Sequence, residues 1–168
     1  MGPGPSDVPQ RVLDALARPT IGHLDPAFVG LMDEIKDLLR YAFQTSNALT
    51  MPISGPGSVG MEACVVNLVE PGDTVVVCQN GVFGGRLKEM ITRAGGTAVS
   101  VEIPWGRAVD PERLRAALAE HPETAIVAFV QAETSTGALS DARELARIAH
   151  EAGALTLVDA VTSLGGCE

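Results

Sequence analysis

Apolar residues along the chain follow two alternating spacings, one typical of helices and one typical of buried strands. The longest helical repeat starts at Asp25-Pro26, where a capping residue precedes a proline in the first helical turn, and it continues to about Phe43. A weak strand is expected over 50–54, although Pro52 disfavours it. Further helices are expected over 9–16, 58–69, 85–94, 110–120 and 141–152, and strands over 74–78, 97–103, 124–130 and 154–158.

Strands that are apolar on both faces and alternate with helices predict an α/β fold. The expected architecture is a mostly parallel sheet covered by helices on both faces, in three layers. In such sheets ligands bind beyond the carboxyl ends of the strands. The loops that follow the strands are therefore where we expect the functional residues.

The composition narrows the class of protein. Hydrophobic residues make up 46% of the 168 residues and charged residues 20%, which supports a packed core rather than disorder. With 21 acidic and 12 basic residues the net charge is -9, which disfavours nucleic acid and anionic membranes as partners. No apolar run reaches the ~18–20 residues of a membrane span, and the amino terminus lacks the pattern of a secretory signal. The three cysteines are far apart, so we expect no disulfide or metal site and a cytoplasmic location.

The loop over 54–60 has the spacing G-x-G-x-x-G between an expected strand and an expected helix. A plain tight turn is one interpretation. A dinucleotide site would need an acidic residue about 20 positions on, and Asn80 and its neighbours are not acidic. A phosphate-binding turn is the third interpretation of this loop, because backbone N–H groups at a helix start and the Ser58 hydroxyl attract a phosphate.

Three further loops carry candidate residues. Phe83 lies among glycines after the strand over 74–78, either as a core anchor or as a face on which a planar ring stacks. Hydroxyl groups and one carboxylate crowd the loop over 131–137, which is either a turn or a hydrogen-bonding site. Asp159 ends an apolar strand, where a carboxylate either caps a loop or pairs with a cation such as a protonated ring nitrogen.

Together these stretches resemble the class V, fold type I aminotransferases that use pyridoxal 5'-phosphate, in the alanine–glyoxylate (serine–pyruvate) branch. The similarity runs along the whole chain with the motifs in the same order. The matching stretches are GPGPS at Gly2–Ser6, MDEIKDLLRYAFQT at Met32–Thr45, SGPGSVGMEA at Ser54–Ala63, NLVEPGD at Asn67–Asp73, ETSTG at Glu133–Gly137 and VDAVTSLGG at Val158–Gly166.

The resemblance implies a role for particular residues. It implies that Phe83 stacks on the pyridine ring, that Thr134 forms a hydrogen bond near the ring edge, and that Asp159 pairs with the pyridinium nitrogen. The GPGPS arm would lie near the substrate, and Gln131 stands where many relatives have histidine. Residues implied for the phosphate turn and for the opposite ring face are Pro56, Gly57, Ser58 and Val161.

The resemblance also implies a catalytic lysine, which would lie beyond Glu168. The chain holds two lysines, Lys36 and Lys88, and we expect both at the surface. We therefore expect residues 1–24 to be an N-terminal arm and residues 25–168 to be the N-terminal portion of the cofactor-binding large domain. Such a fragment is expected to be inactive alone and to expose apolar surface that needs a partner.

The leading functional hypothesis is transfer of an amino group from alanine or serine to glyoxylate or a similar 2-oxo acid, by a homodimer when intact. A ureidoglycine–glyoxylate aminotransferase of purine breakdown remains open as an alternative. A non-catalytic subunit or pseudoenzyme of the same fold is a second alternative, because the chain lacks the lysine. A nucleotide-binding module is a more distant one.

Overall fold

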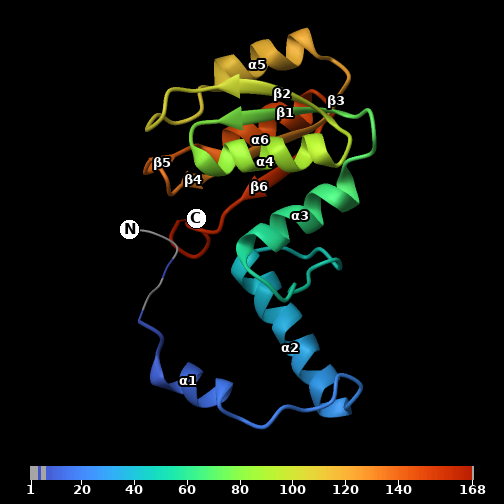
Figure 1. Cartoon of the computed structure of the whole chain (residues 1–168), viewed down its shortest axis with the longest axis vertical. Helices are drawn as coiled ribbons and strands as arrows, with labels where there is room; N and C mark the ends of the chain where they lie inside the picture. Colours follow the sequence, from blue (N-terminus) through green and yellow to red (C-terminus); the bar gives the residue numbers. More distant parts are fainter. Residues whose placement is uncertain (1–3, 5–6, 168) are drawn as a thin grey trace. The chain divides into compact units, whose positions relative to one another are not determined.

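The computed structural model of this 168-residue chain describes Gly4 and residues 7–167. Residues 55–167 form one compact unit, and the described residues up to Ser54 form another. Figure 1 draws both, with colour following the sequence. The division into an arm and a large domain at residue 25 stays a prediction.

The N-terminal unit is built around α2 (Pro26–Phe43), whose start follows the predicted capping pattern. The Asp25 carboxylate accepts a hydrogen bond from the backbone N–H of Ala27 at 2.8 Å, and a proline occupies the first helical turn. The helix ends at Phe43, and its C-cap residue Gln44 has a left-handed backbone with a φ of 51°. A short helix, α1 (Gln10–Leu16), precedes α2, as predicted.

The strand predicted over 50–54 does not form, so this prediction is wrong. Pro52 has no N–H group to donate to a neighbouring strand. Just before this stretch, the Arg40 guanidinium donates to the backbone carbonyls of Asn47 and Ala48, each at 3.1 Å. These bonds hold the chain after α2 against the end of that helix, and the segment that follows is an irregular loop.

The second unit contains a parallel sheet of 4 strands in the order β2-β1-β3-β6. Each pair of neighbours is parallel, which confirms the predicted sheet. The strands carry β-branched and apolar residues along nearly their whole length, as expected for strands buried on both faces. They are β1 (Thr74–Gln79), β2 (Thr97–Glu102), β3 (Thr124–Val130) and β6 (Leu155–Asp159).

Helices cover both faces of the sheet, which confirms the predicted three layers (Figure 1). Successive strand residues point to opposite faces, so β1 contributes to two cores. Val76 and Cys78 belong to one core, and Val75 and Val77 to the other. The first core is closed by α5 (Pro111–Glu120) and α6 (Ala142–Glu151), and the second by α3 (Gly57–Leu68) and α4 (Val82–Arg93).

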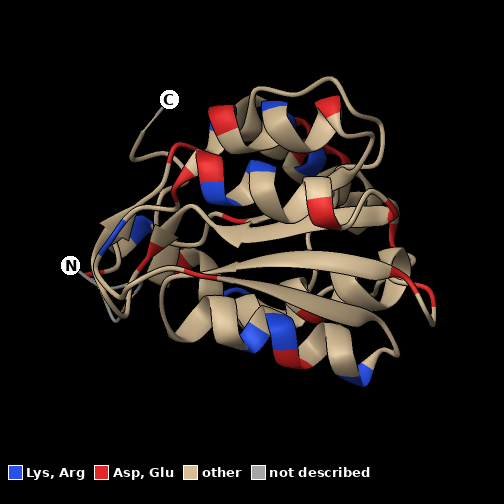
Figure 2. Ribbon diagram, turned by 90° about the horizontal axis from the view of Figure 1, so that it is seen from above, with Lys and Arg blue, Asp and Glu red and all other residues tan. Residues whose placement is uncertain are grey.

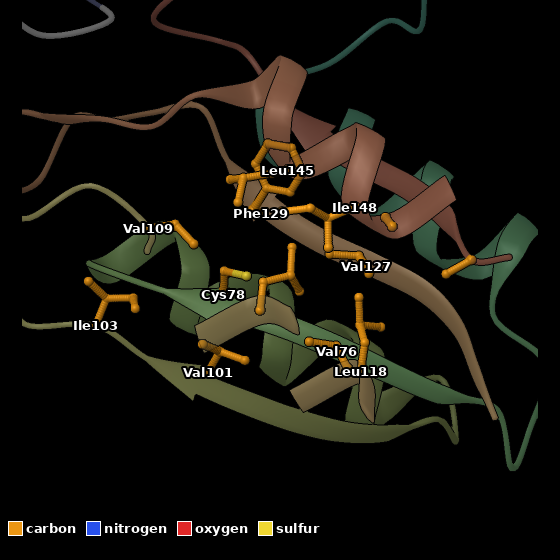
Figure 3. Packing of buried hydrophobic residues seen from close by; sticks show 13 residues of the cluster. Val76, Cys78, Val101, Ile103, Val109, Leu118, Val127, Phe129, Leu145 and Ile148 are labelled. Carbon is orange, nitrogen blue, oxygen red and sulfur yellow. The ribbon is translucent and has the colours of Figure 1, made fainter. Parts of the chain in front are cut away.

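Figure 3 shows the core under α5 and α6. The ring of Phe129, on β3, lies against Leu145 of α6 and is fully buried. Leu145 is also fully buried. Burying side chains of this size contributes about 1.5–3 kcal/mol each to folding. This core therefore fixes α6 on the sheet.

Charged residues lie on helices and loops, whereas the central residues of the strands are uncharged (Figure 2). Within the four-stranded parallel sheet, the charged residues are Glu102 and Asp159, the last residues of β2 and β6. In the part of the chain that the structure describes, no helix is long and apolar enough to cross a membrane.

Two local features differ from the sequence-based expectation. Helix α4 begins at Val82 rather than at residue 85, so Phe83 lies in its first turn and not in a loop. The loop predicted over 131–137 contains a short antiparallel hairpin made by β4 (Ala132–Glu133) and β5 (Ala138–Leu139). The two features are in contact, because the buried Glu133 side chain of β4 accepts hydrogen bonds from the backbone at the start of α4.

Replacing a leucine inside the core is expected to destabilise the protein far more than replacing one outside it. Leu145→Ala removes a side chain that is 0% exposed, so the free energy of unfolding should fall by about 2–5 kcal/mol. Leu139→Ala is the matched control because Leu139 is 57% exposed, and its effect should stay within about 0.5 kcal/mol. Denaturant unfolding of both variants measures the difference, and equal losses would contradict this packing.

The three cysteines are expected to differ in reactivity. Burial raises the pKa of the Cys78 thiol to about 12, so almost none of it is thiolate at neutral pH. Cys64 and Cys167 are exposed. A thiol reagent at pH 8 should label these two in the native protein and Cys78 only after denaturation. Rapid native labelling of Cys78, located by peptide mass spectrometry, would contradict its burial on β1.

Candidate functional site

The predicted site residues gather at one edge of the sheet. Strands β1, β3 and β6 are parallel neighbours, so the loops after their carboxyl ends lie side by side. A backbone hydrogen bond from Gln131 N–H to the carbonyl of Asp159, at 2.9 Å, joins two of these loops. The start of α3 lies at the same edge, because Gly57 of α3 is close to Val161 in the loop after β6.

The turn at the start of α3 is shaped by a glycine. Gly55 has a φ of +156°, and a Cβ added there would lie 2.9 Å from Cγ2 of Val59. Pro56 follows as the N-cap, and no side chain caps this helix start. The half-buried Ser58 places its hydroxyl in the first turn. This helix start therefore offers backbone N–H groups that no side chain caps among the described residues.

Asp159 and Val161 lie next to this turn. Asp159 is the last residue of β6, and its Oδ1 accepts a hydrogen bond from the Val161 N–H at 3.0 Å. A Cβ added to Gly57 would lie 3.0 Å from Cγ2 of Val161, which places the loop after β6 directly against the start of α3. The Asp159 carboxylate is half-buried, and among the described residues it has no cationic side chain within ion-pair distance.

Phe83 is held in place through its backbone. Glu133 is fully buried, and its Oε2 accepts hydrogen bonds from the N–H groups of Phe83 at 3.0 Å and Gly84 at 3.2 Å. Oε1 of the same carboxylate accepts from the Ser135 hydroxyl at 2.6 Å, and that hydroxyl accepts from the Val82 N–H at 3.0 Å. The hairpin thereby caps α4, which is why α4 starts earlier than its own sequence predicts.

The backbone that leads into α4 leaves no room for a larger residue. A Cβ at Gly81 would lie 2.3 Å from Cγ of Glu133 and 2.6 Å from the Ser135 hydroxyl oxygen. Asn80 is fully buried, and its Nδ2 donates to the carbonyl of Arg107 at 3.0 Å. Its side chain is thus directed into the protein, at the position where a dinucleotide site would need an exposed acidic group.

Arg86 connects two of the predicted site residues, and the sequence-based prediction missed it. Its Nη1 donates to the Ser58 hydroxyl at 2.9 Å, and its guanidinium carbon lies 5.0 Å from the centroid of the Phe83 ring. Arg86 follows Phe83 by three residues, so the two share a helix face once the helix starts at Val82. The sequence predicted that this helix starts at residue 85, which leaves Phe83 outside the helix, so the shared face of Phe83 and Arg86 was not recognised.

The remaining candidates are less closely tied to these contacts. Thr134 is half-buried next to Glu133, and its hydroxyl forms no hydrogen bond within the described residues. Gln131 accepts a hydrogen bond from the Ser163 hydroxyl at 2.8 Å, so its amide joins the loops after β3 and β6. The GPGPS stretch lies outside the described residues, apart from Gly4.

The two lysines of the chain lie in different units. Lys36 lies on α2 in the N-terminal unit, where its ammonium group pairs with Asp33 at 2.8 Å. The Lys36 ammonium lowers the pKa of the Asp33 carboxyl through a hydrogen bond and through its charge. Lys88 is a half-buried residue of α4, five positions after Phe83 and so on a different face of the helix.

The site residues form a continuous series of contacts across segments that are distant in the sequence. It runs from Asp159 to Val161, then to the start of α3, then through Arg86 to Phe83 and on to Glu133. One small ligand at this edge can therefore meet a helix start with N–H donors, a guanidinium, an aromatic face and a carboxylate. The N–H donors and the guanidinium suit an anion, and the aromatic face and the carboxylate suit a planar ring that carries positive charge.

Removing the Glu133 carboxylate is expected to loosen the start of α4. Glu133→Ala leaves the N–H groups of Phe83 and Gly84 without a partner, so the free energy of unfolding should fall by about 1–3 kcal/mol. Glu133→Gln keeps one acceptor oxygen and should lose less. Glu112→Ala, at an exposed position of α5, is the control. Denaturant unfolding and hydrogen exchange at residues 82–84 measure the effect, and unchanged exchange in Glu133→Ala would contradict this cap.

Comparison with known proteins identifies a family for the chain as a whole. The family model described as aminotransferase class-V matches residues 2–168. An alanine–glyoxylate aminotransferase of Drosophila melanogaster is 42% identical over 170 residues, which cover 100% of this chain and 43% of the relative. An (S)-ureidoglycine–glyoxylate transaminase of Bacillus subtilis is 39% identical over 168 residues, covering 100% of this chain and 40% of the relative.

A solved structure gives the same result for the fold. The alanine–glyoxylate aminotransferase of Nostoc sp. superposes with a TM-score of 0.95 at 49% identity, over 99% of this chain and 44% of that one. The chain thus spans less than half the length of the relatives that it matches. The family model covers almost every residue, and the chain belongs to the class V aminotransferase family.

Proposed function

We propose that this chain is the cofactor-binding portion of a transaminase that uses pyridoxal 5'-phosphate. The reaction proposed is transfer of an amino group from alanine or serine to glyoxylate or a similar 2-oxo acid. The observation that carries the proposal is the continuous series of contacts that joins the start of α3, Arg86, Phe83 and the loop after Asp159. The chain spans less than half of its relatives' length, so the activity belongs to the proposal for the whole protein.

The start of α3 fits the phosphate group of the cofactor. Residues 56–58 form a helix start with no side-chain cap, and backbone N–H groups in such a position favour a dianion. A Cβ added to Gly57 would lie 3.0 Å from Cγ2 of Val161, so the turn has little room for a larger residue at position 57. In the proposal, Pro56, Gly57 and Ser58 hold the phosphate.

The pyridine ring fits between the groups that lie at the ends of β1, β3 and β6. Phe83 offers an aromatic face in the first turn of α4, and Val161 offers an apolar side chain, 57% exposed, in the loop after β6. Asp159 offers a carboxylate that keeps a ring nitrogen protonated, and Thr134 offers a free hydroxyl near the hairpin. These four residues would orient the ring, while the phosphate turn anchors it.

The residues of this chain act by binding and by electrostatics. When bound, pyridoxal phosphate supplies a ring that withdraws electrons from the α-carbon of an amino acid. Asp159 would hold the proton on the ring nitrogen and so maintain that withdrawal. Phe83 and Val161 would fix the plane of the ring and exclude water from its faces. Lys36 pairs with Asp33 and Lys88 lies on a different face of α4 from Phe83, so neither is proposed as the proton-transferring base.

Ureidoglycine–glyoxylate transamination is a second candidate for the whole protein. It is supported by the 39% identity to the transaminase of Bacillus subtilis that carries this name, and by a TM-score of 0.95 to the structure of a ureidoglycine–glyoxylate aminotransferase from the same organism. A homodimer also remains part of the proposal for the intact protein. It is supported by apolar side chains on α2 that are exposed, among them Leu38 and Phe43.

The charge of Asp159 is expected to strengthen cofactor binding. Pyridoxamine 5'-phosphate is a suitable probe, because it carries the ring and the phosphate but cannot react with Lys36 or Lys88. Asp159→Asn keeps an oxygen that can accept from the Val161 N–H, so the loop should persist while affinity falls roughly tenfold. Equilibrium dialysis of the chain with this probe measures the change.

Glu102→Gln is the matched control, because Glu102 is an exposed carboxylate at the end of β2, and its affinity should equal that of the unaltered chain. Equal affinity of Asp159→Asn and Glu102→Gln would remove Asp159 from its proposed role. Failure of the unaltered chain to bind the probe would contradict the cofactor proposal itself.

A further inference from the structure

Arg86 contacts residues at both ends of the proposed cofactor site. Its Nη1 donates to the Ser58 hydroxyl at 2.9 Å, at the proposed phosphate end. Its guanidinium carbon lies 5.0 Å from the centroid of Phe83, at the proposed ring end. The two contacts come from one planar group, so they fix the distance between the start of α3 and the first turn of α4.

The charge of Arg86 is also not neutralised by a neighbouring carboxylate. Among the described residues, Arg93, Arg115 and Arg147 each pair with a glutamate, whereas no carboxylate lies within 4.0 Å of the Arg86 guanidinium nitrogens. Glu133, the buried carboxylate of this region, is instead occupied by the start of α4. Arg86 is half-buried and keeps donors on its guanidinium that form no hydrogen bond within the described residues.

A half-buried guanidinium with free donors beside a helix start is well suited to a phosphate. Arginine presents several N–H groups in a fixed plane, which matches the oxygens of a phosphate better than lysine does. The helix start alone contributes only partial positive charge, and it is screened by water. A full positive charge beside it raises the affinity for a dianion in a chain whose net charge is -9.

We propose that Arg86 is a positioning residue of the cofactor site. It supplies a positive charge for the phosphate and holds Ser58 and Phe83 in their relative positions. This inference rests on the proposed function, since it concerns the same site. It assigns the phosphate a side-chain cation within this chain. It also predicts that the phosphate end and the ring end of the site are coupled through one residue.

The experiment compares two probes that differ only in the phosphate group, pyridoxamine 5'-phosphate and pyridoxamine. Their affinities for the full chain are measured by equilibrium dialysis. The affinity for pyridoxamine 5'-phosphate divided by the affinity for pyridoxamine reports the contribution of the phosphate. In Arg86→Met this ratio should fall roughly 10- to 100-fold, because charge-assisted hydrogen bonds to the phosphate are lost. Arg86→Lys keeps the charge without the planar group, so it should recover part of the ratio.

Arg93→Met is the matched control, because Arg93 lies on the same helix, is exposed and pairs with Glu89. Its ratio should equal that of the unaltered chain. Thermal unfolding of each variant establishes that it is folded, and if Arg86→Met does not fold, the ratio in Arg86→Lys decides, with a several-fold decrease expected.

Three outcomes would overturn the proposal. An unchanged ratio in Arg86→Met would show that the guanidinium does not bind the phosphate. An equal loss of affinity for both probes would show a purely structural role. A gain in affinity would show that Arg86 occupies the place of the ligand. These results differ from failure of the proposed function, in which the unaltered chain binds neither probe.

Discussion

The buried carboxylate of Glu133 is the interaction on which the arrangement of the strand-end loops depends. An anion removed from water costs several kcal/mol unless donors surround it. Here the donors are the N–H groups of Phe83 and Gly84 and both the N–H and the hydroxyl of Ser135. They occupy both carboxylate oxygens, and the positive end of α4 adds to them. These hydrogen bonds therefore hold the hairpin against the start of α4.

The parallel sheet brings the Glu133 hairpin and the other strand-end loops to one edge. Because β1, β3 and β6 are neighbours that run in the same direction, their three loops meet without any long connection. The start of α3 joins them through Gly57 and Val161, and Arg86 carries the connection on to Phe83. Rigid elements thus place an anion-binding helix start, an aromatic ring and a carboxylate around one small volume, as a bound cofactor requires.

The sequence predicted the features whose signals are local. Asp25, Asp110 and Asp141 cap the helices that follow them, and β-branched runs mark the buried strands, so these elements were located to within a few residues. The start of α4 was missed because its cap is Glu133, which lies 50 positions further along the chain. The predicted roles of Phe83 and Asp159 stay predictions, and Arg86, which contacts Ser58 and Phe83, was missed because that relation depends on the start of α4.

The closeness of Gly57 to Val161 has a consequence for how this protein can change. Substitutions at contacting positions are not independent, so the tolerance of one residue depends on the identity of the other. With valine at 161, a methyl group at 57 would lie 3.0 Å from Cγ2 of that valine, which is closer than ordinary van der Waals contact. A smaller residue at 161 would make room for alanine at 57. Sequence drift at this edge should therefore proceed through paired exchanges, with the two loops diverging together.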